Sequence, residues 1–325
     1  MTSETSRAAA AFVDARLPAA RTLGDELADL IGEPEVFVVA LRAGLAQLAD
    51  PEYGAVQDRV APGSGVTIGV RWPLIHAVEH ALLGPFRESS PDVVLWLAQR
   101  LASEPAREVR LFSLPCLART LPSDPERSWH VLRRLSRDAS DWIAVDAIAE
   151  VYAKGVLAER FRWAELEQLV YSDRRMERRL VGSTLARIPH QVPRARHAQL
   201  DPRGALELIG QLMGDADDQV QRALSWALRE WSRVDRVVVG RWLTEQATDA
   251  ALADDGHRAW VIRDALPAQT PEVAEPIRAR LVGIRRRPGA PSTSRATGIA
   301  REFGLVATTD RDIAQQGERF NGRGA

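Results

Sequence analysis

The stretch SDWIAVDAIAEVYAKG, residues 140–155, has the apolar spacing of an amphipathic helix. Trp142, Val145, Ala149 and Tyr152 recur at intervals of three and four residues and form one apolar stripe. Asp146 stands in the middle of this stripe, four residues after Trp142. Because a carboxylate rarely enters a protein core without a partner, Asp146 is a candidate functional residue.

Four other stretches share this pattern and indicate a helical repeat. The five begin at residues 105, 140, 173, 215 and 254, so their offsets are 35, 33, 42 and 39 residues. A helix pair about every 40 residues is the size of a HEAT unit, and strand signals are nearly absent. We therefore predict an all-α fold, a right-handed α-solenoid of HEAT-like helical repeats. The same period would also fit an irregular helical bundle.

The composition is that of an ordinary globular protein. The 325 residues are 45% apolar and 27% charged, with a net charge of -1. This near-zero charge neither supports nor excludes a nucleic-acid partner. Cys116 is the one cysteine, so no intrachain disulfide can form. With no apolar run of membrane-spanning length and no signal peptide, we expect a cytoplasmic protein.

The two ends of the chain differ from the repeats. Residues 1–10 lack periodicity, and residues 285–325 are rich in Gly, Pro, Ser, Thr and Arg. We expect a flexible N-terminus over 1–10, the solenoid over 11–284 and a mostly disordered tail over 285–325. Within that tail, a short helix is predicted near DRDIAQQGERF, residues 310–320.

Stacked repeats would align residues of equal register on one concave face. Asp146 and Arg179 both stand six residues after the start of their repeats, and Arg222 stands seven. Indole rings and a carboxylate stabilise a positive charge, and arginines bind phosphate. A nucleotide that loses a positively charged base presents both features. The alternative is that Asp146 forms an ion pair with an arginine of another helix, while the tryptophans are anchors of the core. The predicted patch comprises Trp142, Asp146, Arg179, Arg222, Trp226 and Arg229.

Two other groups of residues carry weaker signals. His76 and His80 have the i, i+4 spacing of metal ligands, but there is no HExxH order and no Cys or Asp cluster nearby. We therefore expect helix histidines and no bound metal. The stretch PGSGVTIG, residues 62–69, lacks the GK[ST] ending of a P-loop and is interpreted as a connector.

Several segments resemble a known family. WIAVD, RRMERRLVGS and QRALSWALREWSR are similar, in order and spacing, to the signature segments of the AlkD-like, HEAT-repeat alkylpurine DNA glycosylases. Upstream, FVVALRAGLAQLADPEYGAVQDRV and IGVRWPLIHAV resemble the first helix pair of that family and its G-V-x-x-P turn. The resemblance spans residues 35 to 250.

The resemblance implies roles for the residues of the predicted patch. Asp146 would be the catalytic carboxylate, Trp142 and Trp226 the indoles around the damaged nucleotide, and Arg179 the arginine that positions phosphate. The implied substrates are double-stranded DNA purines alkylated at N3 or N7, and no metal or organic cofactor is implied. The implied product is an abasic site, left without strand cleavage by a monofunctional enzyme. We also expect DNA contacts from Arg229, Arg222, Arg175 and Arg178.

The sequence departs from the family pattern at three places, one of them a loop lengthened by HQVPRARHAQLDPRG, residues 190–204. RVAPGSGVTIGVRWP replaces a Y-M-K stretch, and Met176 stands where the family has tryptophan. Two other functions are kept as alternatives: a noncatalytic HEAT-repeat protein that binds distorted or branched DNA, and a HEAT adaptor for protein partners. We expect a monomer with no membrane partner, associated with the nucleoid when bound to DNA.

Overall fold

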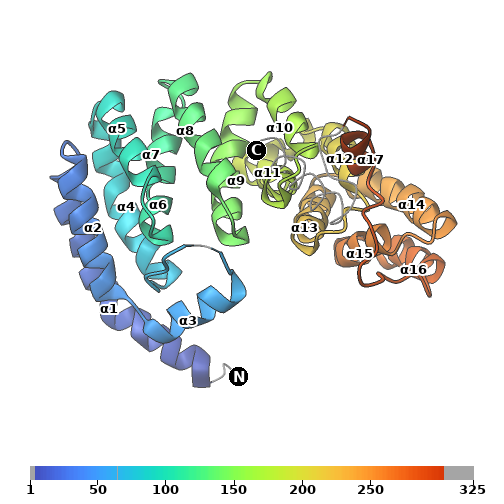
Figure 1. Cartoon of the computed structure of the whole chain (residues 1–325), viewed down its shortest axis with the longest axis horizontal. Coiled ribbons are helices and arrows are strands. Elements are labelled where there is room, and N and C mark those ends of the chain that lie inside the picture. The colour runs from blue at the N-terminus through green and yellow to red at the C-terminus, as the bar shows by residue number, and fades with distance from the viewer. Residues whose placement is uncertain (1–3, 64, 304–325) are drawn as a thin grey trace, which may run out of the picture. The chain divides into compact units, whose positions relative to one another are not determined.

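The computed structural model describes residues 4–63 and 65–303 of the chain. Over these residues it contains seventeen α-helices, two 3₁₀ turns and no strand beyond a single bridge between Val66 and Ala106 (Figure 1). The all-α prediction is therefore confirmed. In this part of the chain no helix has the length and apolarity to cross a bilayer. The chain divides into two compact units, one ending at Ala158 and the next beginning at Glu159.

The first unit is built of nine helices over its described residues. α1 packs against α2 and α4, α5 against α7, and α8 against α9. Prolines at the first turns of α2, α3, α5 and α8 set the helix starts, since proline has no N–H to leave unsatisfied there. The helices are α1 (Glu4–Ala28), α2 (Pro34–Leu48), α3 (Pro51–Val60), α4 (Trp72–Glu88), α5 (Pro91–Ala102), α6 (Arg107–Leu111), α7 (Ser113–Thr120), α8 (Pro125–Asp138) and α9 (Trp142–Ala158).

The second unit repeats this arrangement of neighbouring helix pairs. α11 packs most extensively on α13, α13 on α15, and α14 on α16. Within each unit, most helices contact helices one to three places further along the chain, as in a helical-repeat solenoid. The elements are α10 (Arg162–Val170), α11 (Arg175–Gln191), η1 (Arg194–Gln199), α12 (Pro202–Leu212), α13 (Asp218–Val234), α14 (Arg236–Leu252), α15 (Gly256–Ala265), η2 (Leu266–Ala268), α16 (Pro271–Arg280) and α17 (Arg295–Glu302).

A glycine allows the close approach of α11 and α13. A Cβ atom added at Gly182 would lie 2.8 Å from Ala223 Cβ and 2.9 Å from its carbonyl carbon. The indole of Trp231 ties the same two helices together by donating from Nε1 to Leu185 O at 2.9 Å. Both residues of the Gly182–Ala223 contact are buried, and no side chain larger than the methyl group of Ala223 fits between the two helices there.

The N-terminal residues differ from the expectation of a flexible segment. Helix α1 already begins at Glu4, so residues 4–10 are helical. Their alanine run has strong helix propensity without the apolar periodicity on which the expectation rested. Further along α1, Ala20, Leu23 and Leu27 are buried in the packing of the first unit.

Part of the C-terminal region also differs from the expected disorder. Residues 285–294, called the strap below, run over the second unit and lead into α17, which packs on α12. Thr293 N donates to Gly214 O at 2.9 Å, and Thr293 Oγ1 donates to Asp255 Oδ2 at 2.6 Å. Such backbone and hydroxyl contacts leave no signature in composition, which is why the segment reads as a tail. The helix predicted at 310–320 lies outside the described residues.

Candidate functional site

Helix α9 carries Trp142 and Asp146 at its first two turns. Asp141 caps the helix, because its Oδ1 accepts hydrogen bonds from Ile143 N at 2.9 Å and Ala144 N at 3.0 Å. Trp142 and Asp146 are therefore one turn apart on the same edge of the helix. Both are only partly buried. The carboxylate thus lies at the rim of the apolar stripe and not inside the core.

The indole of Trp142 is held by the end of α3. Its Nε1 donates to Val60 O at 3.2 Å, and Ser140 Oγ, just before α9, donates to Gly63 O. Gly63 has a φ of +90°, a value that favours glycine. The Gly/Pro loop that replaces the Y-M-K stretch therefore fixes the start of α9 and the orientation of its tryptophan.

A buried charge pair supports this helix start. The side chains of Arg107 and Asp141 are only 3% and 1% exposed, with Nη1 and Oδ1 4.0 Å apart. Arg107 Nη2 also donates to Gln57 Oε1 at 3.5 Å. Neither residue was singled out from the sequence. Asp141 could have been found as an N-cap before an apolar run, whereas nothing local marks Arg107.

A groove of about 490 Å³ runs beside α9 in the first unit. Trp72 and His76 stack along one side with ring centroids 5.8 Å apart. Lys154, the one lysine of the chain, lies on the α9 side with its Nζ 3.7 Å from Glu150 Oε1. The groove is lined by residues of α4, α7 and α9, among them Glu79, Phe86, Leu114, Ala147 and Val151.

His76, weighed from the sequence as a metal ligand, pairs with a carboxylate instead. Its Nδ1 lies 3.0 Å from Glu79 Oε2, and this hydrogen bond raises the pKa of His76. Over residues 4–63 and 65–303, no three His, Cys, Asp or Glu side chains are grouped to hold a metal ion.

In the second unit, Arg179 is anchored at the beginning of α13. Its Nη1 donates to Gln219 O at 2.6 Å and lies 3.3 Å from Gln219 Oε1. The residue is 5% exposed, so this guanidinium is held in a defined position. Arg175, one turn earlier on α11, is far more exposed and has its Nη1 3.7 Å from Asp217 Oδ2. Met176, where the family has tryptophan, is buried.

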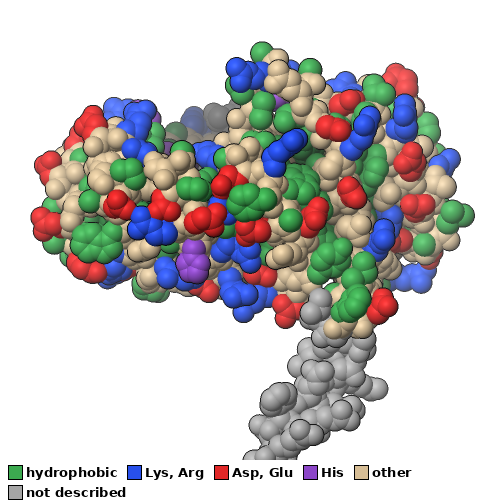
Figure 2. Space-filling model, turned by 90° about the horizontal axis from the view of Figure 1, so that it is seen from above, with side chains coloured by type: hydrophobic (Ala, Val, Ile, Leu, Met, Phe, Trp, Pro, Cys, Tyr) green, Lys and Arg blue, Asp and Glu red, His purple; other side chains and the backbone are tan. Residues whose placement is uncertain are grey.

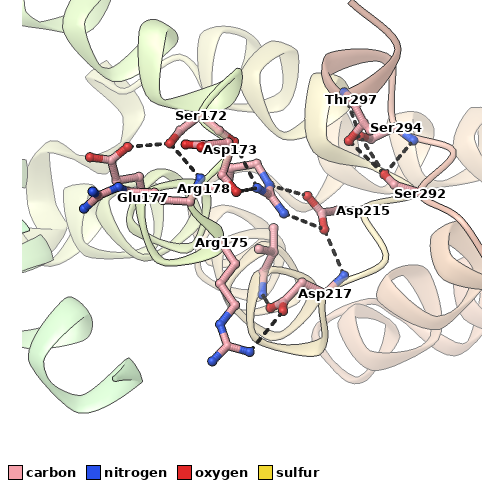
Figure 3. A network of polar contacts seen from close by, with 12 residues as sticks. Ser172, Asp173, Arg175, Glu177, Arg178, Asp215, Asp217, Ser292, Ser294 and Thr297 are labelled. Atoms are coloured by element: carbon pink, nitrogen blue, oxygen red, sulfur yellow. Dashed lines mark hydrogen bonds and ion pairs between the residues drawn. The ribbon is translucent and has the colours of Figure 1, made fainter. Parts of the chain in front are cut away.

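Arg178 belongs to a structural network and not to an exposed surface (Figure 3). Its Nε donates to Asp215 Oδ2 at 2.7 Å, and its Nη2 donates to Asp215 Oδ1 at 3.4 Å. Its Nη1 donates to Ser172 O at 2.9 Å and Asp173 O at 3.0 Å. These bonds fasten the turn between α10 and α11 to the start of α13. The guanidinium of Arg178 thus already has a carboxylate and two carbonyl partners, and its expected contact with DNA stays a prediction.

Trp226 and Arg229 both have polar partners on α13 and α15. Trp226 Nε1 donates to Glu230 Oε1 at 3.2 Å, and Arg187 lies over the indole at 5.1 Å. Arg229 Nη1 donates to Asp264 Oδ2 at 2.6 Å. Burial favours a raised pKa for Asp264, but hydrogen bonds from Ser225 and Arg229 outweigh it and leave that pKa lowered. Arg222, one turn before Trp226, is exposed.

The predicted patch thus falls into two sets. Trp142 and Asp146 share α9 in the first unit, whereas the arginines and Trp226 lie on the packed helices α11 and α13 of the second. That the two sets act on one nucleotide remains a prediction from the repeat register. On the face shown in Figure 2, basic and acidic side chains are interspersed, in agreement with the near-zero net charge.

The sequence profile of a family described as DNA alkylation repair enzyme matches residues 41–267. The chain belongs to this family. The matched range includes α9, α11 and α13 and ends before the strap. Membership carries the family's general role in DNA alkylation repair, while the reaction itself has to be argued from the site.

Comparison with solved structures supports the fold. A structure described as a predicted DNA alkylation repair enzyme from Enterococcus faecalis superposes with a TM-score of 0.50 at 16% identity. The alignment covers 61% of this chain and 89% of that one. At this identity the likeness shows the shared helical architecture. A search of curated proteins gave no match.

Proposed function

We propose that this member of the DNA alkylation repair family is a monofunctional DNA glycosylase. It would hydrolyse the N-glycosidic bond of purines alkylated at N3 or N7 in duplex DNA and leave an abasic site, acting as a monomer. The observation that carries the proposal is the pair formed by Trp142 and Asp146, one turn apart at a capped helix start and both accessible at the rim of the core.

The chemistry suits a carboxylate in this position. An N3- or N7-alkylated purine is cationic, so it departs with the electron pair of the glycosidic bond as a neutral base. Positive charge then develops on the deoxyribose, where a carboxylate such as Asp146 and an indole face such as Trp142 stabilise it. Water adds its oxygen to the sugar C1′ and gives up a proton, which Asp146 can accept.

The position of Lys154 supports a monofunctional enzyme. Strand cleavage by this kind of enzyme needs an amine that attacks the sugar. Lys154 follows Asp146 by eight residues, about 12 Å along the helix axis, and lies in the groove beside Glu150. The one lysine amine of the chain is therefore displaced from the carboxylate that would face the reacting sugar.

The arginines of the second unit are proposed to hold the sugar-phosphate backbone. Arg175 and Arg222 are exposed, while Arg179 and Arg229 are held by Gln219 and Asp264. A guanidinium held in place loses little further side-chain freedom when it binds a phosphate, and its planar fork can donate two hydrogen bonds. These residues would position the damaged site through contacts to the DNA backbone, with few contacts to the edges of the bases.

The test is base release from a duplex carrying one N7-methylguanine or a 3-methyladenine analogue. Asp146→Asn should slow single-turnover release by roughly 10²- to 10³-fold, the usual cost of removing one electrostatic group at a reacting centre. The affinity for the duplex should change less than threefold, since Asp146 contributes no phosphate contact. Glu150→Gln, one turn further along α9, is the matched control and should retain release.

Other outcomes point to the other two functions. Tight duplex binding without release by the unaltered protein would reject the glycosylase and favour a noncatalytic DNA-binding protein. No duplex binding at moderate salt would favour a protein adaptor. A double-mutant cycle of Asp146→Asn with Trp226→Ala tests the predicted patch, because residues that act on one nucleotide should give strongly non-additive losses of release.

A further inference from the structure

The strap brings an arginine onto the second unit that the family match does not include. The guanidinium of Arg286 lies 4.6 Å from the centre of the Trp260 ring on α15. Its Nη1 donates to Gln221 Oε1 at 2.9 Å and also pairs with Asp218 at the start of α13. Arg286 thereby joins three elements of the unit: α13, α15 and the strap.

A second arginine approaches the same indole. The guanidinium of Arg222 lies 5.8 Å from the Trp260 ring centre, so one ring receives two cations from positions far apart in sequence. Trp260 stands six residues after the start of its repeat at residue 254, the register of Asp146 and Arg179 in theirs. The ring therefore belongs to the face that the repeat register predicts for DNA.

The strap has anchors other than Arg286. Thr293 binds Gly214 O and Asp255, and His257 Nε2 lies 3.2 Å from Ala290 O. A Cβ on Gly256 would overlap the backbone of Arg285, so the strap also packs closely against the start of α15. These contacts hold the strap on both sides of position 286. The strap therefore does not depend on Arg286 for its attachment to the second unit.

We propose that Arg222, Trp260 and Arg286 form a clamp for the backbone of duplex DNA, called the guanidinium clamp below. Stacking on an indole orients each guanidinium while leaving N–H groups in its plane to donate to phosphate oxygens. The indole edge would pack against deoxyribose. Arg286 would exchange Asp218 for a phosphate on binding. The inference rests on the proposed DNA partner but not on catalysis.

The charges around the clamp favour an anionic partner. Arg285 and Arg287 flank Arg286 in the strap, and Arg287 pairs with Asp254. The side chain of Asp218 is 59% exposed, so its attraction for Arg286 is screened and a phosphate can replace it. A duplex supplies phosphates along its whole length, which suits two guanidinium groups held on one ring.

The experiment measures equilibrium binding of the full chain to an undamaged duplex across a range of salt concentrations. Arg286→Ala should weaken binding roughly tenfold at physiological salt, the loss expected for one charge-assisted hydrogen bond. The slope of log affinity against log salt should fall by about 0.9, the value for one phosphate contact. Trp260→Leu should weaken binding more than Trp260→Phe, which keeps a ring.

Arg287→Ala is the matched control, since it removes an equal charge from the same strap. It should change affinity by less than threefold. Asp218→Asn keeps the strap anchors and removes the competing carboxylate, so it should tighten duplex binding by a fewfold. A purely structural ion pair predicts no tightening. Equal effects of Arg286→Ala and Arg287→Ala, or unchanged affinity in Asp218→Asn, would overturn the clamp.

Base release separates this inference from the proposed function. With protein saturating the damaged duplex, Arg287→Ala, which lies outside the clamp, should release base at the unaltered rate, whereas Arg286→Ala should need more protein to reach saturation. If the clamp variants change duplex affinity as expected but no protein releases base, the glycosylase is rejected and the clamp is retained. Normal release with no binding effect would reject only the clamp.

Discussion

The two units present opposite charges at corresponding helix starts. In the first unit, Asp146 is accessible at the second turn of α9 while the cation Arg107 is buried behind the cap. In the second unit, the cation Arg222 is exposed while the carboxylate of Asp215 is buried beneath Arg178. The first arrangement suits a developing positive charge, and the second suits phosphate. Under the proposed function, repeats of one architecture would serve different chemistry, because each helix start leaves a different charge accessible.

The buried pair of the first unit should give the largest effect on stability. Asp141→Ala removes the cap of α9 and leaves Arg107 without its carboxylate in the core, so we expect a loss of about 3 kcal/mol in the free energy of unfolding. Denaturant unfolding followed by circular dichroism measures it, and base release should fall because the first turn of α9 frays. Asp138→Ala, an exposed acid just before the cap, is the control. Equal losses in the two variants would show that the pair is unimportant.

The close contact of α11 and α13 gives the corresponding test in the second unit. Gly182→Ala forces these helices apart and should cost about 1 to 3 kcal/mol. Gly210→Ala is the matched control, because a Cβ there meets only Trp242 at an ordinary 3.7 Å. That variant should stabilise the protein by up to about 1 kcal/mol, since alanine is the better helix former. If both variants change the free energy of unfolding in the same direction, the close approach does not determine the packing of this unit.

Acid should reveal a smaller difference between the units. Burial favours a raised pKa for Asp50, but hydrogen bonds from Tyr53 N and Arg71 outweigh it, so this pKa, like that of Asp264, lies below its ordinary value of 3.8. The stability that each carboxylate contributes is complete above about pH 4 and is lost as the pH falls through the lowered value. Asp50→Asn and Asp264→Asn should therefore both flatten the acid limb of the stability curve.

The effect should be greater for Asp50, whose side chain is 11% exposed against 44% for Asp264. Denaturant midpoints of both variants and the unaltered chain at pH 7 and pH 3 measure the difference. Acid limbs of unchanged steepness in both variants would contradict the prediction.

The sequence predicted the helices better than the contacts between them. Repeat starts at 140, 173, 215 and 254 fall within three residues of helices α9, α11, α13 and α15, because apolar periodicity and capping residues are local signals. The same pattern placed Asp146 in the middle of the apolar stripe, whereas the structure places it at the rim. The hydrogen bond from Trp142 to Val60, 82 residues away, has no such signal.

The arginines show the same limit. Position alone did not separate Arg178, committed to Asp215, from its exposed neighbour Arg175. Arg286 read as part of a disordered tail because its partners Gln221 and Trp260 come from other helices. Which guanidinium is available to a ligand depends on tertiary ion pairs, and these cannot be read from composition or register.

The solitary lysine in the groove makes the protein convenient to study by fluorescence. An amine-reactive dye has Lys154 as its one side-chain target in the chain, and the groove lies along the helix that carries Asp146. Cys116 is fully buried, and burial raises the pKa of its thiol, so this thiol should not compete with Lys154 for the dye. Once the N-terminal amine is blocked, a single reporter can test whether DNA binds beside α9 without any engineered substitution.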